Sequence, residues 1–482
     1  MSLAADVHPT VRRAIRCGDE AIRDHDPDSA AAHYREALDL SPDNPDALIG
    51  LEYADYLRSK RPSRFDFGLS PSGAPQTQLK EENQRQIELD FRSGTTVSKG
   101  FPVNGFFEHT TRCNFYCPHC TKGYDPYFAQ ELPRDRLNAT LEELLPRLKW
   151  ACITGFGEPT IGERYPELMR KLVGEGVRPH FNTNTSTLTL PHIEALVKCN
   201  AHVTLSVDGA TKETFETIRA GGSWEKLIYS LHAIRRIRAI LAGGSSFEVT
   251  FVAMRKNIDE LPEMVRLVHR FDLDLLRVQD YYFYDIEYDN QSLRYEPERA
   301  NRRLEEAEQV ARDLGVALLI PPRYSMGSPD LKASLWKKAL TTRRIFPARK
   351  RFPQSCKSPW QEVKILVDGR VAPCCFSDTG MGNIQKDSFE KIWNGIRYRF
   401  FRWRIRTIFP PRECRVCHSS EGINKGNPAN VLLKEGLLVK VFYYLEHRIQ
   451  KWFYTRRKKG EVKNYYKGKW LRPNPAVQSR SE

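Results

Sequence analysis

The stretch "CNFYCPHC", residues 113–120, places three cysteines with three and then two residues between them, just after the largely apolar run at 103–108. Four thiolates complete a tetrahedral zinc site or fully ligate an iron–sulfur cubane, whereas three leave one iron of a 4Fe-4S cluster open to a substrate. Ferredoxin cysteines are spaced differently, at two, two and three residues with a following proline. A zinc site would need a fourth ligand, for which His119 is available. The triplet therefore predicts an open iron–sulfur site, with zinc as the alternative.

Short strand-like runs alternate with helical stretches on both sides of this loop. The runs lie at 103–110, 150–157, 177–184, 202–209, 247–254 and 275–282. Such alternation predicts an α/β fold whose parallel sheet curls into a partial (β/α)6 barrel. Chemistry in such barrels lies at the carboxyl ends of the strands. We therefore expect the cysteine loop, "GFGEPT" (155–160), "NTNTS" (182–186), "SVDG" (206–209) and "QD" (279–280) to meet at one rim.

Two motifs in the sequence resemble those of a known family. Cys113, Cys117 and Cys120 match the CxxxCxxC signature of the radical S-adenosylmethionine (radical SAM) superfamily, and "GFGEP" at 155–159 is similar to its GGEP motif. The resemblance covers about residues 101–321. It implies that the three cysteines ligate a 4Fe-4S cluster whose open iron binds S-adenosylmethionine. Reductive cleavage of that cofactor would give a 5'-deoxyadenosyl radical that abstracts a substrate hydrogen.

The resemblance also assigns contacts with the cofactor. The backbone around Gly155, Phe156, Gly157 and Glu158 should meet the methionyl amino group, where glycine permits close approach. His119 stands where the family usually has an aromatic residue beside the adenine. The positions assigned to the ribose, the carboxylate and the adenine are Asn184, Ser206, Arg219 and Val278. Residues at strand ends can instead simply close turns or cap helices, and that alternative stays open.

A second set of cysteines follows the barrel. "WQEVKILVDGRVAPCC" (360–375) predicts a hairpin with an Asp-Gly turn, and "CRVC" (414–417) comes after a helical stretch. This pattern resembles the SPASM/Twitch extension of radical SAM enzymes, a small α+β domain, and "GNI" (382–384) and "IWNG" (392–395) strengthen the likeness.

The SPASM/Twitch resemblance implies one auxiliary 4Fe-4S cluster with four protein ligands. These ligands are Cys356, Cys374, Cys414 and Cys417. Cys375 could take the place of its neighbour, and structural zinc in the same four thiolates is the alternative. Cys17, Cys152 and Cys199 are expected to be buried thiols.

The domain plan has six parts. They are a tetratricopeptide-like repeat at 1–60, a linker at 61–100, the radical SAM core at 101–322, a connecting segment at 323–355, the SPASM/Twitch domain at 356–420, and a basic C-terminal helix and tail at 421–482. The first part is predicted to be an all-α helical hairpin, from the small-large-small-proline spacing of Gly18, Ala30, Tyr34, Ala37 and Pro42. It either packs on the main domain or recruits a partner.

Charge is concentrated at the C-terminal end of the chain. The net charge is +15, and residues 431–482 contribute 13 Lys/Arg against 4 Asp/Glu. A helix folded back on the enzyme is favoured over contact with an anionic membrane surface, and both are favoured over nucleic-acid binding. Residues 1–18 lack the apolar core of a secretory signal. We therefore expect a cytoplasmic protein whose cysteines bind metal rather than form disulfides.

The function predicted from these motifs is that of a radical SAM oxidoreductase. Its substrate is a small sugar or aminocyclitol-like molecule, and the auxiliary cluster accepts an electron from it. A flavodoxin-like or ferredoxin-like protein supplies the first electron, and Asp208 or Asp280 is the candidate base by position. One alternative is a peptide or protein maturase that recruits its target through the helical repeat. An alternative of another class is a zinc-bound scaffold that binds nucleic acid.

Overall fold

The computed structural model describes residues 8–59, 62–68, 77–120, 130–281, 291–324, 356–377, 379–407, 411 and 414. The chain divides into two compact units. The first comprises Met1–Lys80, Phe107–Thr121 and Phe128–Gly327, and the second comprises Glu81–Phe106, Lys122–Tyr127 and Ser328–Glu482. None of the described helices is both long and apolar enough to cross a membrane.

The first unit is built on a parallel sheet with strand order β2-β3-β4-β5-β6-β7. Its strands are β2 (Trp150–Cys152), β3 (Arg178–Thr183), β4 (His202–Ser206), β5 (Ser246–Ala253), β6 (Leu275–Asp280) and β7 (Leu318–Leu319). With β1 (Asn104–Phe107), all six predicted strands are present, and β7 is an addition that the sequence did not predict. The predicted α/β class is confirmed.

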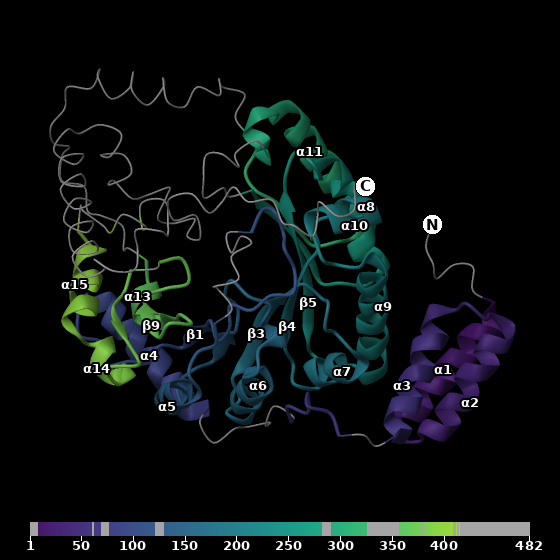
Figure 1. Cartoon of the computed structure of the whole chain (residues 1–482), viewed down its shortest axis with the longest axis horizontal. Helices are drawn as coiled ribbons and strands as arrows, with labels where there is room; N and C mark the ends of the chain where they lie inside the picture. The colour runs from purple at the N-terminus through teal and green to yellow at the C-terminus, as the bar shows by residue number, and fades with distance from the viewer. Residues whose placement is uncertain are drawn as a thin grey trace, which may run out of the picture. The chain divides into compact units, whose positions relative to one another are not determined.

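Helices and short 3-10 turns connect these strands. They are α5 (Arg134–Leu144), η2 (Pro159–Ile161), α6 (Tyr165–Gly174), α7 (Leu190–Lys198), α8 (Lys212–Ile218), α9 (Trp224–Leu241), η3 (Ile258–Glu260), α10 (Leu261–Arg270), η5 (Leu293–Tyr295) and α11 (Pro297–Leu314). Helix α6 lies against β3 and α10 lies against β6 (Figure 1).

The two faces of the sheet differ in polarity. On β5, Phe247, Val249 and Phe251 are fully buried and point to one face, because successive residues of a strand alternate. Glu248 and Thr250 point to the other face. The sheet therefore has an apolar face and a polar face, and the polar face is the one that Ser206 shares through its pairing with Thr250.

Three helices form the N-terminal part of the first unit: α1 (Pro9–Arg23), α2 (Pro27–Leu40) and α3 (Pro45–Ser59) (Figure 1). A Cβ on Gly18 would lie 2.5 Å from Tyr34 Cε1, and one on Gly50 would lie 2.6 Å from it, so the glycines admit the ring. Arg236 on α9 forms a buried ion pair with Asp19 on α1. The predicted helical hairpin is present with a third helix added, and it packs on helix α9 of the same unit. The tetratricopeptide resemblance itself stays a prediction.

The segment predicted as a linker, 61–100, differs from the expectation. Phe65 stacks on His192 with ring centroids 4.1 Å apart, and Phe67 packs edge-on against Tyr165 at 5.8 Å. Helix α4 (Thr77–Ser93) fills much of the remainder. The proline- and serine-rich composition suggests a linker, but Phe65 and Phe67 in this segment are buried. The described part of the segment therefore packs against the first unit at these two residues.

The second unit contains the predicted hairpin. Its strands have the order β10-β9-β8-β1, and β8 (Glu362–Ile365) pairs antiparallel with β9 (Arg370–Ala372) and β9 with β10 (Gly382–Asn383). Gly369 supplies the positive φ of +78° that the turn requires. Short helix α13 (Ser358–Gln361) precedes the hairpin, and α14 (Phe389–Trp393) and α15 (Ile396–Arg404) follow it.

Two expectations for the second unit need comment. The single helix expected after the hairpin is split, because the chain leaves the helical conformation at Asn394 and Gly395 before α15 begins. The predicted basic C-terminal helix and tail at 421–482 and the predicted ligand Cys417 lie outside the described residues.

Candidate active site

The cysteine loop is tied to the end of strand β3 by an amide network. Asn184 donates from Nδ2 to Asn114 Oδ1 at 3.0 Å and approaches Cys113 Sγ at 4.0 Å. Asn114 in turn donates to Ser186 Oγ at 2.9 Å, and Ser186 donates to Asn184 Oδ1 at 2.6 Å. The structure thus brings the predicted cofactor residue Asn184 to the predicted ligand Cys113.

The loop is also tied to the segment after α8. The backbone N–H of Tyr116 donates to Ala220 O at 2.8 Å. Gly221 has a φ of +96°, and a Cβ there would lie 3.2 Å from Asn114 O. Glycine is therefore needed at this position for both its backbone conformation and the closeness of the loop.

Arg219, Asp208 and His119 form a charged group beside Cys117. Arg219 Nε lies 2.6 Å from Asp208 Oδ2, without the alignment of a hydrogen bond, so the contact is an ion pair. His119 Nε2 lies 3.4 Å from the same oxygen, and Arg219 Nη1 donates to Cys117 Sγ at 4.0 Å. Four predicted site residues from separate parts of the sequence therefore meet.

Burial and charge shift the titration of this group. Burial lowers the pKa of Arg219, but Asp208 and Cys117 outweigh that effect and raise it above its ordinary value. Burial lowers the pKa of His119 to about 4, against the opposing effect of Asp208. Burial also raises the pKa of the Cys117 thiol to about 11, while Arg219 acts to lower it. The arginine is the cation that favours a thiolate here.

The "GFGEP" turn packs on the start of the cysteine loop. A Cβ on Gly155 would lie 2.2 Å from Glu108 Cγ, and one on Gly157 would lie 2.5 Å from Arg112 O. The N–H of Phe156 donates to Glu108 Oε1 at 3.0 Å, while the Phe156 side chain is 41% exposed. Contacts within the protein therefore already require glycine at both positions, independently of any contact with the cofactor.

Glu158 is a buried residue whose side chain links the segment after β2 to the end of β3 by hydrogen bonds. Its carboxylate accepts from the backbone N–H groups of Asn184 (2.6 Å) and Thr160 (3.3 Å) and from the hydroxyls of Thr160 (2.5 Å) and Thr183 (2.9 Å). Burial raises the pKa of Glu158, and these bonds act to lower it. The side chain is 2% exposed, so it shapes the turn around it.

Thr185 shows backbone strain at the same place. Its φ is +69°, a value that a β-branched residue rarely adopts. The N–H of Thr185 donates to Thr183 Oγ1 at 3.1 Å. Strained residues of this kind persist where the surroundings fix them and are often found at functional sites.

The remaining predicted residues fall in different places. Ser206 ends β4 on the polar face of the sheet. Val278 is paired with Phe251 and shares its apolar face, a placement that does not favour contact with an adenine on the polar side. Asp280 ends β6, is exposed, and accepts from the Tyr324 hydroxyl at 2.7 Å.

Sequence reasoning missed three residues that build this site. They are Glu108, Asn114 and Asn257. Asn114 lies inside the cysteine triplet and Glu108 ends the preceding apolar run, so their positions gave some signal. Asn257 lies in the segment between β5 and η3, where no motif marks it.

The residues around the first loop fit a three-thiolate cluster by their chemistry. Thiolate sulfur is the ligand that iron–sulfur clusters use, and Cys113, Cys117 and Cys120 are all only partly buried. Nδ1 of His119 is buried and has no hydrogen-bond partner among the described residues, so it is available to a cofactor that would bind beside the loop. Within the described ranges, no three Cys, His, Asp or Glu side chains are already arranged to hold a metal ion. The assignment of an iron–sulfur cluster to this loop therefore rests on its three thiolate ligands and on their spacing in the loop.

The auxiliary cysteines lie in the second unit. Cys356 accepts from the Ser358 N–H at 3.4 Å, and Cys414 is 9% exposed. Cys374 is half-buried, and its pKa is raised by burial and by the neighbouring Cys375, which is exposed. The side chains of these two adjacent cysteines therefore differ in environment.

Two protein-family models match the chain. The model described as "Radical SAM superfamily" matches residues 107–268, and the SPASM model, described as "Iron-sulfur cluster-binding domain", matches residues 356–418. The chain thus contains a radical SAM domain and a SPASM domain. The two domains imply S-adenosylmethionine and two 4Fe-4S clusters as cofactors.

Named relatives are similar at low identity. "Mycofactocin maturase MftC" of Mycolicibacterium smegmatis is 27% identical over 176 residues, which are 36% of this chain and 43% of that protein. "PqqA peptide cyclase" of Gluconobacter oxydans is 26% identical over 335 residues, 66% of this chain and 84% of that protein. The match with the mycofactocin maturase therefore spans less than half of that relative's length.

A solved structure supports the fold. Streptococcus suis SuiB bound to S-adenosylmethionine has a TM-score of 0.50 at 14% identity, over 78% of this chain and 86% of that one. At that identity the likeness concerns the fold alone.

Proposed function

We propose that this radical SAM enzyme matures a peptide or protein substrate. The observation that carries the substrate class is that relatives matching both long and short parts of the chain are named for peptide maturation, as "PqqA peptide cyclase" and "Mycofactocin maturase MftC". These names favour the peptide alternative over the small sugar-like substrate expected from the single auxiliary cluster.

The chain's own residues prepare the site in this proposal. Cys113, Cys117 and Cys120 would hold the first cluster, and Arg219, which donates to Cys117 Sγ, would offer its guanidinium to the carboxylate of the cofactor. When bound, the cluster and S-adenosylmethionine supply a 5'-deoxyadenosyl radical that abstracts a substrate hydrogen atom. Asn184 fixes the loop against the end of β3, so the cofactor meets a preset surface.

The proposal assigns the two candidate bases different roles. Asp208 is fully buried and paired with Arg219, so it is not available to a substrate. Asp280 is exposed at the carboxyl end of β6, where the Tyr324 hydroxyl orients it. We assign the acceptance of a substrate proton to Asp280.

The second unit completes a net oxidation. Cys356, Cys374 and Cys414, with Cys417 outside the described residues, hold the auxiliary cluster. That cluster supplies an acceptor for the second electron. Cys374 is half-buried whereas Cys375 is exposed, and this difference supports the choice of the former. A flavodoxin-like or ferredoxin-like donor delivers the first electron.

The helices α1–α3 bind the target at a fixed place in this proposal. Arg235 Nη2 lies 2.5 Å from Asp46 Oδ1, and the Tyr53 hydroxyl donates to Glu194 Oε1 at 2.8 Å. These contacts join α3 and its N-terminal turn to α9 and α7. A target peptide bound there would therefore stand in a constant relation to the cysteine loop of the same unit.

The chemistry is tested by anaerobic reduction of reconstituted protein with S-adenosylmethionine. We expect 5'-deoxyadenosine from the wild type, none from Cys113→Ala, and wild-type amounts from Cys152→Ala, which removes a buried thiol of β2 outside the motif. Product from Cys113→Ala equal to that of the wild type would refute the assignment.

The substrate class is tested by deuterium transfer. Deuterated peptides encoded near the enzyme's gene should pass deuterium into 5'-deoxyadenosine, and deuterated sugars or aminocyclitols should not. Asp280→Asn should leave this transfer intact while slowing release of the oxidised product. Transfer from a sugar alone would return the substrate to the small-molecule class.

A further inference from the structure

Asp208 lies two residues beyond the end of β4, and its two carboxylate oxygens serve different neighbours. Oδ1 accepts the N–H of Val252 on β5 at 2.7 Å. Oδ2 lies 2.6 Å from Arg219 Nε and 3.4 Å from His119 Nε2. One side chain therefore joins strand β5 to Arg219 and to His119 of the cysteine loop.

Asn257 holds the backbone of Asp208 in place through hydrogen bonds. It is fully buried, and its Nδ2 donates to Asp208 O at 3.0 Å and to Val252 O at 2.9 Å, while Oδ1 accepts the Met254 N–H at 2.7 Å. Both backbone groups of Val252 are thus paired with side chains where the β4–β5 ladder has ended. This arrangement leaves the Asp208 carboxylate little freedom to turn.

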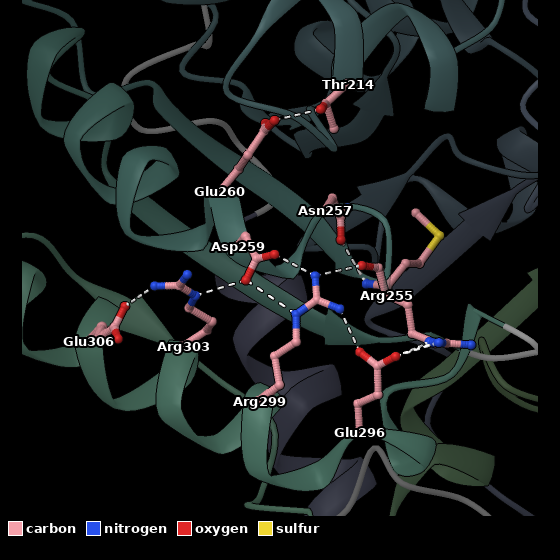
Figure 2. A network of polar contacts seen from close by, with 10 residues as sticks. Thr214, Arg255, Asn257, Asp259, Glu260, Glu296, Arg299, Arg303 and Glu306 are labelled. Atoms are coloured by element: carbon pink, nitrogen blue, oxygen red, sulfur yellow. Dashed lines mark hydrogen bonds and ion pairs between the residues drawn. The ribbon is translucent and has the colours of Figure 1, made fainter.

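A separate network of ion pairs lies next to Asn257, as Figure 2 shows. Asp259, two residues further along, pairs with Arg299 and Arg303 of α11. The Asp259 side chain is 46% exposed, and both of its arginine partners belong to α11. The same stretch of chain therefore offers a carboxylate that supports the fold locally without touching the site.

We infer that Asp208 is a positioning residue that holds Arg219 beside His119 of the cysteine loop, with Asn257 fixing the backbone of Asp208 in turn. The inference rests on the proposed function, since Arg219 is there the group that meets the cofactor's carboxylate. It replaces the role of base that position alone suggested for Asp208. A buried carboxylate already paired with a guanidinium orients its partners rather than accepting a proton.

The test separates strand support from arginine positioning. Asp208→Asn keeps an amide oxygen for the Val252 N–H but turns an NH2 group toward Arg219, which repels the guanidinium. We expect the dissociation constant for S-adenosylmethionine, measured by equilibrium dialysis on cluster-loaded protein, to rise about tenfold or more. That is the effect of losing one charged hydrogen bond, here the one proposed between Arg219 and the carboxylate of the cofactor. Asp259→Asn, the matched control, should bind as the wild type does.

A double mutant shows whether Asp208 acts through Arg219. If it does, Asp208→Asn combined with Arg219→Gln should bind no more weakly than Arg219→Gln alone, because the second change removes what the first misplaces. Additive losses would overturn the inference, as would a dissociation constant for Asp208→Asn within about twofold of the wild type.

Hydrogen exchange in the cluster-free protein gives a readout that does not depend on the cofactor. Amides of residues 113–120 should exchange faster in Asp208→Asn than in Asp259→Asn or the wild type. Equal exchange in all three would overturn the inference. If the wild type bound no S-adenosylmethionine, the proposed function would fail, and the exchange rates would still decide whether Asp208 positions the loop.

Discussion

Glu158→Gln is the substitution whose effect on the site can be worked out most fully. The Glu158 carboxylate accepts four hydrogen bonds, three at Oε1 and one at Oε2. Glutamine has the same shape but only one acceptor oxygen. If that oxygen keeps the bonds from Thr160 and Thr183, the NH2 group faces the N–H of Asn184, and two donors oppose each other.

The magnitude follows from these bonds. A hydrogen bond to a charged group contributes about 1.5 to 3 kcal/mol, and a buried donor left unpaired costs about 1 to 3 kcal/mol. The smaller desolvation cost of a neutral amide offsets part of that loss. We expect the free energy of unfolding to fall by about 2 kcal/mol, which lowers the urea midpoint by about 1 M if the slope is about 2 kcal/mol per molar.

The assay compares urea unfolding and cofactor binding in two variants. Glu163→Gln is the control, because this nearby carboxylate is 65% exposed and lies 3.4 Å from Arg112 Nη1 in a surface pair that contributes little. Glu158→Gln should lower the midpoint and also weaken S-adenosylmethionine binding, since Asn184 loses its fixed backbone contact. A midpoint shift no larger than that of Glu163→Gln would show that the buried junction does not hold the turn.

Three further outcomes are expected. Gly157→Ala should reduce iron incorporation at the first cluster, measured by iron analysis, because its Cβ would lie 2.5 Å from the backbone oxygen of Arg112. Gly50→Val should weaken packing of the N-terminal helices on Tyr34 and speed proteolysis there without changing iron content. Burial raises the pKa of Glu248, but its charged neighbours outweigh this and hold it at about 2, so Glu248 stabilises the fold above its unfolded pKa. The wild-type urea midpoint should therefore fall between about pH 4.5 and pH 2 more steeply than that of Glu248→Gln.

The strands could be predicted because their signal is local. In β5 the apolar residues Phe247, Val249 and Phe251 alternate with Glu248 and Thr250, and that period of two is visible without any tertiary contact. The helix after the hairpin was predicted less well, because Asn394-Gly395 interrupts a stretch that otherwise has helical composition. Strand β7, only two residues long, gives too short a pattern to be recognised.

The site could be predicted in its residues but not in their contacts. The motifs identified Gly155 and Arg219, yet the close partner of the first is Glu108, which lies 47 residues earlier. Nothing in the sequence shows that Arg219 pairs with Asp208, since the pairing depends on how β4 and α8 end. Composition likewise concealed Phe65, whose partner His192 is far along the chain.

Two carboxylates show why a residue's place at the rim does not settle its role. Sequence position put Glu158 beside the cofactor and made Asp208 a candidate base, but both are buried and occupied by protein groups. Glu158 accepts the Asn184 N–H and Asp208 pairs with Arg219 Nε, so each directly contacts a residue that the proposed function assigns to cofactor binding. Because the ends of parallel strands leave backbone groups unpaired, buried carboxylates at such a rim are needed first to satisfy them. This is why the proposed function assigns proton transfer to an exposed group, Asp280.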